Sequence, residues 1–268
     1  KTTNMIRSLT ISGIAISLLA GNAAFAATPT PTPMPSATTF DAAPSPTATA
    51  TPSPTGSASP SPSASVTPSP QPTSIPRPNI QSASSLLVVV NKQRPLNPKT
   101  YVPKPLSTVN GVSLYKDAAT ALKQMAAGMK AAGAGTLWLN SGYRSYTTQV
   151  AVHEKEVRAL GLAAGERLAA RPGYSEHQTG LAADVSAIGQ GCQIQVCFAK
   201  TKAGKWLAAN SWQYGWVLRY ENGQTSTTGY QYEPWHFRFV GVEVATDYRA
   251  KHAHSLEAYW GLPAAPNY

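Results

Sequence analysis

The sequence predicts an α+β fold, in which helices pack on a small, mainly antiparallel sheet. Two amphipathic helical patterns come before a set of short apolar runs that are spaced like the strands of hairpins. This order favours α+β over a doubly wound parallel sheet. We expect the fold to occupy residues 85–268, because a chain of that length normally forms one globular unit with its own core.

The first expected elements are a strand and a helix. An apolar, β-branched run at residues 86–90 predicts a strand, which the breakers at residues 91–98 end. Apolar residues then recur at three- and four-residue spacing over residues 118–129. They predict an amphipathic helix that Asp117 caps and Gly133 ends.

A buried strand at residues 136–139 then leads into a Ser-Gly-Tyr-Arg-Ser segment at residues 141–145. Ser145 is expected to cap a second helix at residues 146–160, which places Arg144 at a strand-to-helix corner. The rest of the chain predicts a helical piece at 163–169, a strand at 181–185, a helix at 202–211, strands at 216–219 and 235–240, and a closing helix at 242–259.

Residues 1–27 have the pattern of a secretory signal peptide. Early positive charges at Lys1 and Arg7 precede an apolar run, and Ala24-Phe25-Ala26 resembles a cleavage site. Because the apolar run is shorter than the roughly 20 residues that cross a bilayer, we expect no stable membrane span after cleavage. The protein is therefore expected to be secreted and to act in the cell wall or outside the cell.

Residues 28–84 predict a disordered spacer rich in Pro, Thr and Ser. This stretch holds 15 of the 23 prolines and few large apolar side chains. Such a segment cannot offset the entropy lost on ordering, and its X-Pro units favour extended polyproline II. We expect it to separate the signal peptide from the folded domain.

The chain carries a net charge of +10, of which about +8 lies on residues 86–268, and a basic exported domain suggests an acidic substrate or polyanionic surroundings. We do not expect nucleic acid as a partner, because no basic run with interleaved aromatic residues occurs. The two cysteines, Cys192 and Cys197, are expected to form a disulfide in an exported chain. Closing a loop that short gains little chain entropy, so the disulfide is expected to hold only a local hairpin. We expect the protein to be a monomer.

Two distant segments carry the side chains of a metal site. Residues 175–184 contain His177 and Asp184, and residues 233–236 contain Glu233 and His236. Two imidazoles and a carboxylate leave a fourth tetrahedral position for water, and a further carboxylate can take the proton of that water.

The same ligands also make the facial triad of iron oxygenases. Such a triad has no need of a fourth acidic residue such as Glu233, and an exported protein is a poor place to keep ferrous iron. We therefore predict one Zn²⁺ ion held by His177, Asp184 and His236. The other histidines, His153, His252 and His254, are expected to be solvated on helix surfaces.

Three motifs occur in order: Ser-Gly-Tyr-Arg-Ser at 141–145, Ser-x-His-x-x-Gly-x-Ala-x-Asp at 175–184 and Glu-Pro-Trp-His at 233–236. Together they resemble the zinc D-alanyl-D-alanine carboxypeptidases of the VanY type, over roughly residues 86–240. The resemblance implies that the two histidines and the aspartate bind zinc, that Glu233 is the catalytic base and that Arg144 contacts the substrate. The cysteine loop and the spacer do not belong to the shared pattern.

The chemistry of a carboxypeptidase agrees with these roles. A guanidinium binds a terminal carboxylate in a bidentate manner, which makes Arg144 the expected clamp. Gln149, one helical turn further, and Ser175, two residues before His177, are expected to add hydrogen bonds to the peptide. The resemblance thus implies release of the C-terminal D-alanine from peptidoglycan stem peptides.

Two alternatives remain open at this point. One is an L,D-carboxypeptidase that acts on tetrapeptide stems, because relatives with the same motifs do so. The other is a module that binds the cell wall without cutting it, although the intact Glu233 argues against it.

Overall fold

The computed structural model describes residues 78–268, so the predicted signal peptide and most of the predicted spacer lie outside the described residues. Residues 78–84, which the prediction assigned to the spacer, include Ala83, whose side chain is buried in the main hydrophobic core. The packed part of the chain therefore begins before residue 85. Among the described residues, no helix combines the length and the apolarity that crossing a bilayer requires.

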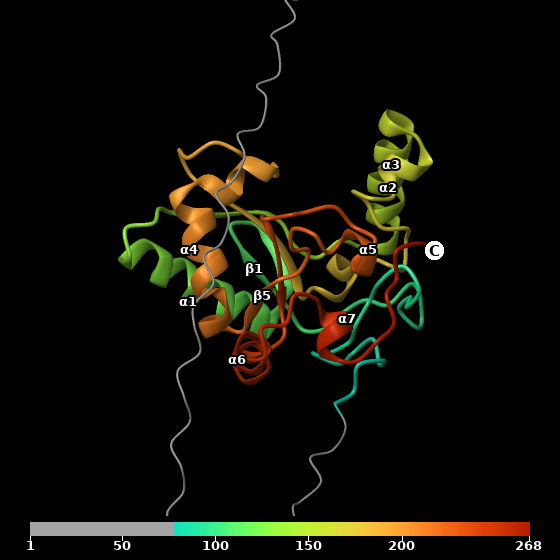
Figure 1. The fold of residues 1–268 in the computed structure, drawn as a ribbon, viewed down its shortest axis with the longest axis horizontal. Helices are drawn as coiled ribbons and strands as arrows, with labels where there is room; N and C mark the ends of the chain where they lie inside the picture. The colour runs from blue at the N-terminus through green and yellow to red at the C-terminus, as the bar shows by residue number, and fades with distance from the viewer. Residues whose placement is uncertain (1–77) are drawn as a thin grey trace, which may run out of the picture. The chain divides into compact units, whose positions relative to one another are not determined.

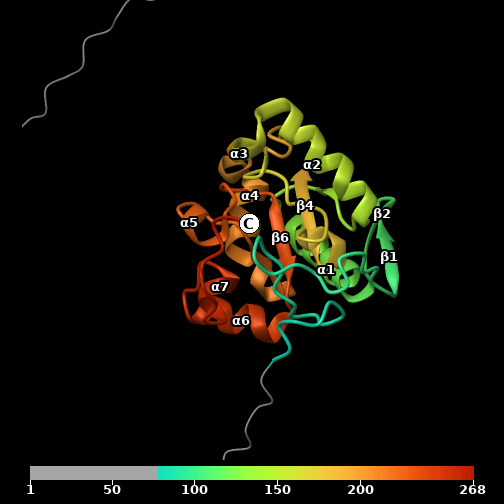
Figure 2. The same ribbon diagram turned by 90° about the vertical axis from the view of Figure 1, so that its right-hand side faces the viewer.

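A four-stranded sheet lies at the centre of the domain (Figures 1 and 2). Its strands, in spatial order, are β3 (Leu137–Ser141), β4 (Ala182–Ala187), β6 (His236–Phe239) and β5 (Trp216–Leu218). All neighbouring pairs are antiparallel, which confirms the predicted kind of sheet.

A separate hairpin pairs β1 (Leu106–Val109) with β2 (Val112–Tyr115). The sequence interpretation missed this hairpin. Its turn is Asn110-Gly111, and both residues have positive φ, as a two-residue hairpin turn requires.

Seven α-helices and three 3₁₀-helices complete the described residues. They are α1 (Lys116–Ala131), α2 (Tyr146–Leu160), α3 (Leu162–Gly165), η1 (Glu176–Thr179), η2 (Val196–Lys200), α4 (Lys202–Asn210), η3 (Ser211–Tyr214), α5 (Thr225–Thr228), α6 (Val242–Ala250) and α7 (Leu256–Tyr259). Ser145 caps α2 as predicted, since its Oγ accepts a hydrogen bond from the Thr148 backbone at 3.1 Å. The prediction for α1 was wrong at its start, where Tyr115 is the N-cap and Asp117 lies in the first turn.

The two faces of the sheet have different chemistry. Successive side chains in a strand point to opposite faces. Val185 and Phe237 lie in the main apolar core together with Leu122 of α1 and Leu207 of α4. Their strand neighbours on the other face are polar and equally buried, and these are Asp184, His236 and Arg238. The alternation therefore places charged groups on one side of a sheet whose other side is an apolar core.

The predicted strand at residues 86–90 is not a strand. Val88, Val89 and Val90 are buried, but the carbonyls of Leu86 and Val88 accept hydrogen bonds from Nη2 of Arg238, at 3.0 and 2.8 Å. The Val89 carbonyl accepts one from Nε of Arg94 at 3.2 Å. Arginine side chains thus satisfy the backbone groups that a sheet ladder would otherwise bind.

Three further boundaries differ from the prediction. The helical piece expected at 163–169 ends as a helix at Gly165. The closing helix is divided into α6 and α7, because His252 has a positive φ of 50° and Ser255 caps a new helix. The last strand begins at His236, one residue later than expected.

Candidate metal centre

The pairing of β4 with β6 brings two candidate ligands together. Asp184 lies directly opposite His236 in the antiparallel register, where side chains on the same face are about 5 Å apart at Cβ. His177 comes from η1, which ends at Gly180 with a positive φ of 71°. A Cβ at Gly180 would lie 2.8 Å from the Tyr115 backbone nitrogen, so glycine is needed where the chain turns from η1 towards β4.

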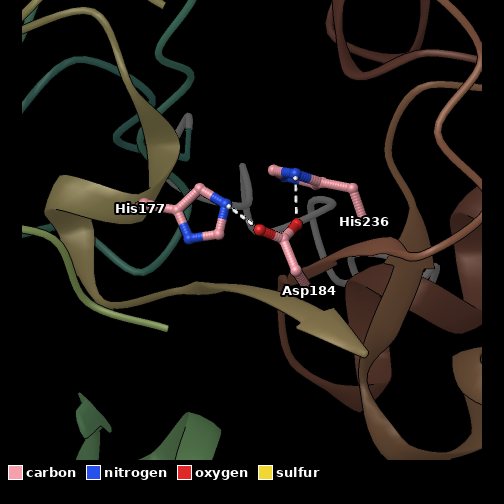
Figure 3. A group of neighbouring side chains, drawn as sticks. All are labelled: His177, Asp184 and His236. Carbon is pink, nitrogen blue, oxygen red and sulfur yellow. Dashed lines mark ion pairs between the residues drawn. The ribbon is translucent and has the colours of Figure 1, made fainter. Parts of the chain in front are cut away.

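The three candidate ligands converge on one point (Figure 3). Nε2 of His177 lies 3.2 Å from Oδ2 of Asp184, and Nδ1 of His236 lies 3.2 Å from Oδ1 of Asp184. All three residues are buried, with exposed fractions of 2%, 8% and 4% for His177, Asp184 and His236. Nε2 of His177 and Oδ1 of Asp184 have no hydrogen-bond partner in the described protein. Buried polar atoms rarely lack a partner, and these two atoms are of the kinds that bind a metal ion.

The spacing and the donor types fit a zinc ion. Each imidazole nitrogen lies 3.2 Å from a different oxygen of Asp184, and one ligand atom from each of the three residues lies within 4.8 Å of the other two, a spacing that can hold a metal ion. Two nitrogens and one oxygen also form a donor set that zinc accepts.

A hydrogen bond orients His177 from behind, and a carboxylate faces the rear nitrogen of His236. Nδ1 of His177 lies 2.7 Å from the Gly142 carbonyl. A carbonyl only accepts, so Nδ1 carries the hydrogen and the Nε2 lone pair faces Asp184. Nε2 of His236 lies 3.6 Å from Oε2 of Glu176, and each of these two atoms otherwise lacks a hydrogen-bond partner. A hydrogen on Nε2 of His236 would therefore face a carboxylate and leave Nδ1 free on the ligand side.

Glu176 belongs to a buried ion network that the sequence interpretation missed. Its Oε1 accepts hydrogen bonds from Nε of Arg219 at 2.8 Å and from Nη1 of Arg238 at 3.0 Å. Arg219 also donates two bonds to the carboxylate of Glu257, at 2.9 and 2.8 Å. All four side chains are at most 1% exposed. The sequence did offer one signal for this network, because Glu176 is a carboxylate directly before the predicted ligand His177.

The buried charges shift the ionisation of the site. Burial lowers the pKa of His177 to about 4. Burial opposes the charge on His236 as well, but the nearby carboxylates of Asp184 and Glu176 outweigh it and raise the pKa of His236 to about 9. Burial also raises the pKa of Glu233 to about 8. The cluster therefore attracts positive charge, and a bound divalent ion would take the place of the proton on His236.

Glu233 and Arg144 lie beside the candidate ligands. Oε2 of Glu233 is 3.5 Å from Nδ1 of His236, and Nη2 of Arg144 is 3.5 Å from Oδ2 of Asp184. Both residues line a cavity of about 500 Å³ that the three candidate ligands also line. The structure thus brings together the residues that the two sequence motifs and the Ser-Gly-Tyr-Arg segment supply.

Gln149 and Ser175 line the same cavity and are buried. Oε1 of Gln149 accepts a hydrogen bond from Nη1 of Arg144 at 3.1 Å, and its Nε2 donates to the Ala170 carbonyl at 2.8 Å. Gln149 therefore fixes the direction of the Arg144 guanidinium.

The remaining histidines lie away from this cavity. Nε2 of His153 is 3.3 Å from Oε1 of Glu166, with side chains only 17% and 12% exposed, so the prediction of a solvated His153 was wrong. His252 and His254 are exposed, and His254 pairs with Glu221 at 2.8 Å.

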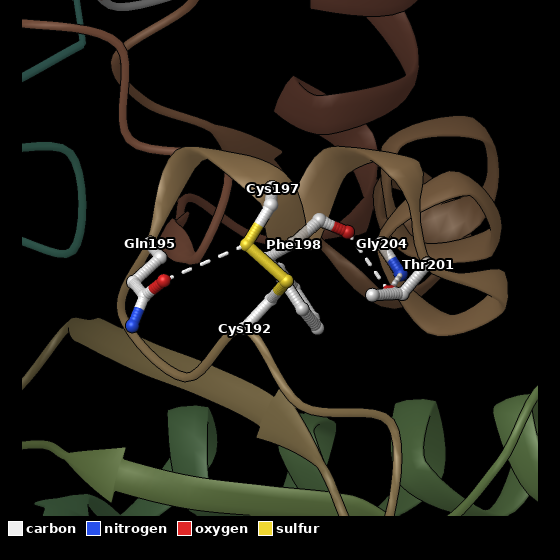
Figure 4. Close-up of a disulfide and its surroundings, with 6 residues drawn as sticks. All are labelled: Cys192, Gln195, Cys197, Phe198, Thr201 and Gly204. Atoms are coloured by element: carbon white, nitrogen blue, oxygen red, sulfur yellow. Dashed lines mark hydrogen bonds between the residues drawn. A yellow bond between two sulfur atoms is a disulfide. The ribbon is translucent and has the colours of Figure 1, made fainter. Parts of the chain in front are cut away.

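Cys192 and Cys197 form the predicted disulfide (Figure 4). It links the segment after β4 to the start of η2, and this loop is not the expected hairpin. The residues within this loop that line the cavity are Ile194, Gln195 and Val196.

Comparison with known proteins finds similar carboxypeptidases and related peptidases of bacteria. Residues 111–242 match the family model described as VanY: D-alanyl-D-alanine carboxypeptidase. A solved structure of the LdcB LD-carboxypeptidase is 36% identical and has a TM-score of 0.61, and the match covers 67% of this chain and 87% of that one. A zinc complex of a mutant VanY D,D-pentapeptidase from a VanB-type vancomycin resistance cassette is 31% identical, with a TM-score of 0.56 and coverage of 64% and 97%.

Among curated proteins, YodJ of Bacillus subtilis is 38% identical over 176 residues, which is 62% of this chain and 64% of YodJ. A D-alanyl-D-alanine carboxypeptidase of Enterococcus faecium is 32% identical over 50% of this chain and 39% of that protein. The chain thus spans less than two thirds of the length of these curated relatives.

Proposed function

Because the chain belongs to the VanY family of D-alanyl-D-alanine carboxypeptidases, we propose that it is a zinc-dependent enzyme that releases the C-terminal D-alanine from peptidoglycan stem peptides. The main support is the convergence of His177, Asp184 and His236 in one cavity with Glu233 and Arg144. D-alanine release from a synthetic stem pentapeptide, with and without a chelator, tests the proposal.

His177, Asp184 and His236 would hold one zinc ion. A bound zinc ion supplies a Lewis acid for the scissile carbonyl and lowers the pKa of water to about 7. Glu233 accepts the proton of the attacking water and passes it to the nitrogen of the departing D-alanine. The burial that raises the pKa of Glu233 favours a carboxyl group that can both take and return a proton.

Arg144 binds the terminal carboxylate of the peptide. Its Nε lacks a hydrogen-bond partner within the described residues, and its side chain is 19% exposed at the cavity. Gln149 acts on the substrate through Arg144, whose guanidinium it holds, and Ser175 contributes a hydroxyl to the peptide-binding wall.

We predict that Arg144→Ala raises KM at least about tenfold on peptides with a free terminal carboxylate, since a charged hydrogen bond contributes about 1.5–3 kcal/mol. Peptides with an amidated C-terminus should show the same low kcat/KM in the variant and the parent. Steady-state kinetics on matched acid and amide peptides makes the comparison, with Arg158→Ala on the exposed surface of α2 as the control. An equal loss on both peptides would contradict a carboxylate clamp.

Glu176 acts as a positioning residue for His236. We predict that Glu176→Gln weakens zinc binding about 10- to 100-fold, because an amide orients the imidazole less strongly than a carboxylate does. Glu257→Gln is the matched control, since it removes one charge from the same buried network without facing His236. Competition with a chromophoric chelator measures the affinity, and equal zinc affinities in the two variants would exclude a specific role of Glu176.

The match to LdcB, an LD-carboxypeptidase, favours a second candidate activity on tetrapeptide stems. The zinc-loaded protein should be compared on pentapeptide and tetrapeptide stems of the same sequence. Faster release from the pentapeptide supports the D,D activity, and faster release from the tetrapeptide supports the L,D activity. If the protein binds both peptides but releases D-alanine from neither, it would be a module that binds the cell wall without cutting it.

Export to the cell wall is part of the proposal. The disulfide supports an oxidising compartment, and the family acts on cell-wall peptides. The monomeric state and the absence of nucleic-acid partners stay predictions.

A further inference from the structure

The loop closed by Cys192 and Cys197 is held firmly at both ends. Gln190 lies just before it, where Nε2 donates to the Ala134 carbonyl at 2.7 Å and Oε1 accepts from the Ala203 backbone at 3.1 Å. Phe198 follows the second cysteine and is completely buried (Figure 4). The path of the loop is therefore fixed relative to β3 and α4.

Within the loop, the backbone adopts a conformation that these residues do not favour. Cys192 and Ile194 have positive φ values of 58° and 49°. This left-handed region is sterically unfavourable for a β-branched residue such as isoleucine. A covalent link between the two ends of the segment offsets that tendency and keeps Ile194 in place.

The tip of the loop forms a wall of the candidate active-site cavity. Ile194 and Val196 line the cavity, yet they are 42% and 51% exposed. On the other side, α2 contributes Val152 and Glu156. Figure 1 shows α2 on one side of the domain and α4, which follows this loop in the chain, on the other. Apolar side chains left open at the mouth of a polar cavity are typical of a surface that a ligand covers.

The cavity extends well beyond the group that would bind the terminal carboxylate. Gln149 holds Arg144, and Glu156 lies seven residues further along α2, which is about 10 Å at 1.5 Å per residue. An extended peptide covers about 10 Å with three residues. Because a carboxypeptidase substrate ends at Arg144, the remaining space is left for residues that precede the scissile bond.

We propose that the disulfide-closed loop, residues 192–197, is a binding wall for the part of the stem peptide that precedes the scissile bond. Ile194 and Val196 contact the apolar parts of those residues, and the disulfide keeps both side chains at the cavity. The inference rests on the proposed function, because the occupant of the wall is the substrate of that reaction.

The test compares a long and a short substrate. The Ile194→Ala/Val196→Ala variant should raise KM for a stem pentapeptide about tenfold, equivalent to the loss of about two buried methylene groups. Its kcat on the pentapeptide and both constants on N-acetyl-D-alanyl-D-alanine should stay within about twofold of the parent, because the short substrate does not reach the wall. The matched control is Ile188→Ala/Val242→Ala, which trims two apolar side chains that are 59% and 54% exposed outside the cavity. The control should change neither KM.

A second variant tests the crosslink. Cys192→Ser/Cys197→Ser should raise KM for the pentapeptide to a similar extent and leave the short substrate unaffected. An unchanged KM for the pentapeptide in this variant would overturn the role of the disulfide. In the Ile194→Ala/Val196→Ala variant, an equal rise in KM for both substrates would contradict the proposal that the loop binds the stem peptide. An unchanged KM for both substrates would contradict it as well.

Binding separates this inference from the proposed function. Pentapeptide affinity is measured by tryptophan fluorescence in a Glu233→Gln background, where the peptide is not consumed. If the parent protein cleaves neither substrate, the proposed function fails. A tenfold weaker pentapeptide affinity caused by the loop substitutions would still support a role of the loop in binding the peptide. An unchanged affinity would contradict it.

Discussion

Replacing Glu233 with Gln should abolish most D-alanine release while leaving the zinc content unchanged. The substitution keeps the shape of a residue that is 5% exposed but removes the carboxylate that takes the proton from water. General base catalysis raises the reaction rate about 10²- to 10⁴-fold, so kcat should fall by a factor of about 10² to 10⁴ with little change in KM. Release of D-alanine and metal analysis by mass spectrometry are measured on the same sample.

Glu221→Gln provides the control for this substitution. Glu221 is a partly exposed carboxylate that pairs with His254, away from the candidate ligands. Its loss should leave kcat within about twofold of the parent, because it touches no group of the mechanism. Full activity in Glu233→Gln would refute the role of Glu233 as the base. Loss of zinc in that variant would instead make Glu233 a ligand.

Replacing Asp184 with Asn should remove zinc from the protein. Asp184 faces both imidazoles, with one carboxylate oxygen 3.2 Å from each, and it is the anionic member of the candidate set. An amide of the same size offers a weaker donor and no charge. We expect zinc affinity to fall by more than the about 10- to 100-fold effect of losing an outer-shell partner, with loss of D-alanine release at stoichiometric zinc.

Thermal unfolding gives an independent measure of this loss. Zinc at 100 times its Kd should stabilise the parent by about 2.7 kcal/mol, whereas the same concentration should hardly shift the Tm of Asp184→Asn. Asp247→Asn is the control, because Asp247 pairs with Lys251 on the exposed side of α6. Zinc binding of parental strength in Asp184→Asn would rule out the proposed ligand set.

The local elements could be predicted from residues that act over one or two helical turns. Ser145 precedes a helical pattern, and its side chain accepts the hydrogen bond that starts α2. Gly180 lies between a histidine and a strand, where only a residue without a Cβ lets the chain turn. The hairpin at Asn110-Gly111 carried an equally local signal that the sequence interpretation did not use.

Two of the errors arose where a distant side chain replaced a local partner. Residues 86–90 have the composition of a strand, but Arg238 of β6 satisfies the Leu86 and Val88 carbonyls. His153 lies on a helix that looks solvated in sequence, and Glu166 from the following segment pairs with it. Neither contact produces a periodic pattern in the sequence, because each joins residues that only folding brings together.

By itself, the sequence determined the types of chemical group available to the protein: two imidazoles, an aspartate, a glutamate and an arginine in three short motifs. The tertiary structure alone decided their arrangement. The antiparallel register sets Asp184 opposite His236, and the buried arginines hold Glu176 behind the second imidazole. The physical reason is that residue types and caps are local properties of the chain, whereas register and burial depend on contacts between residues many positions apart.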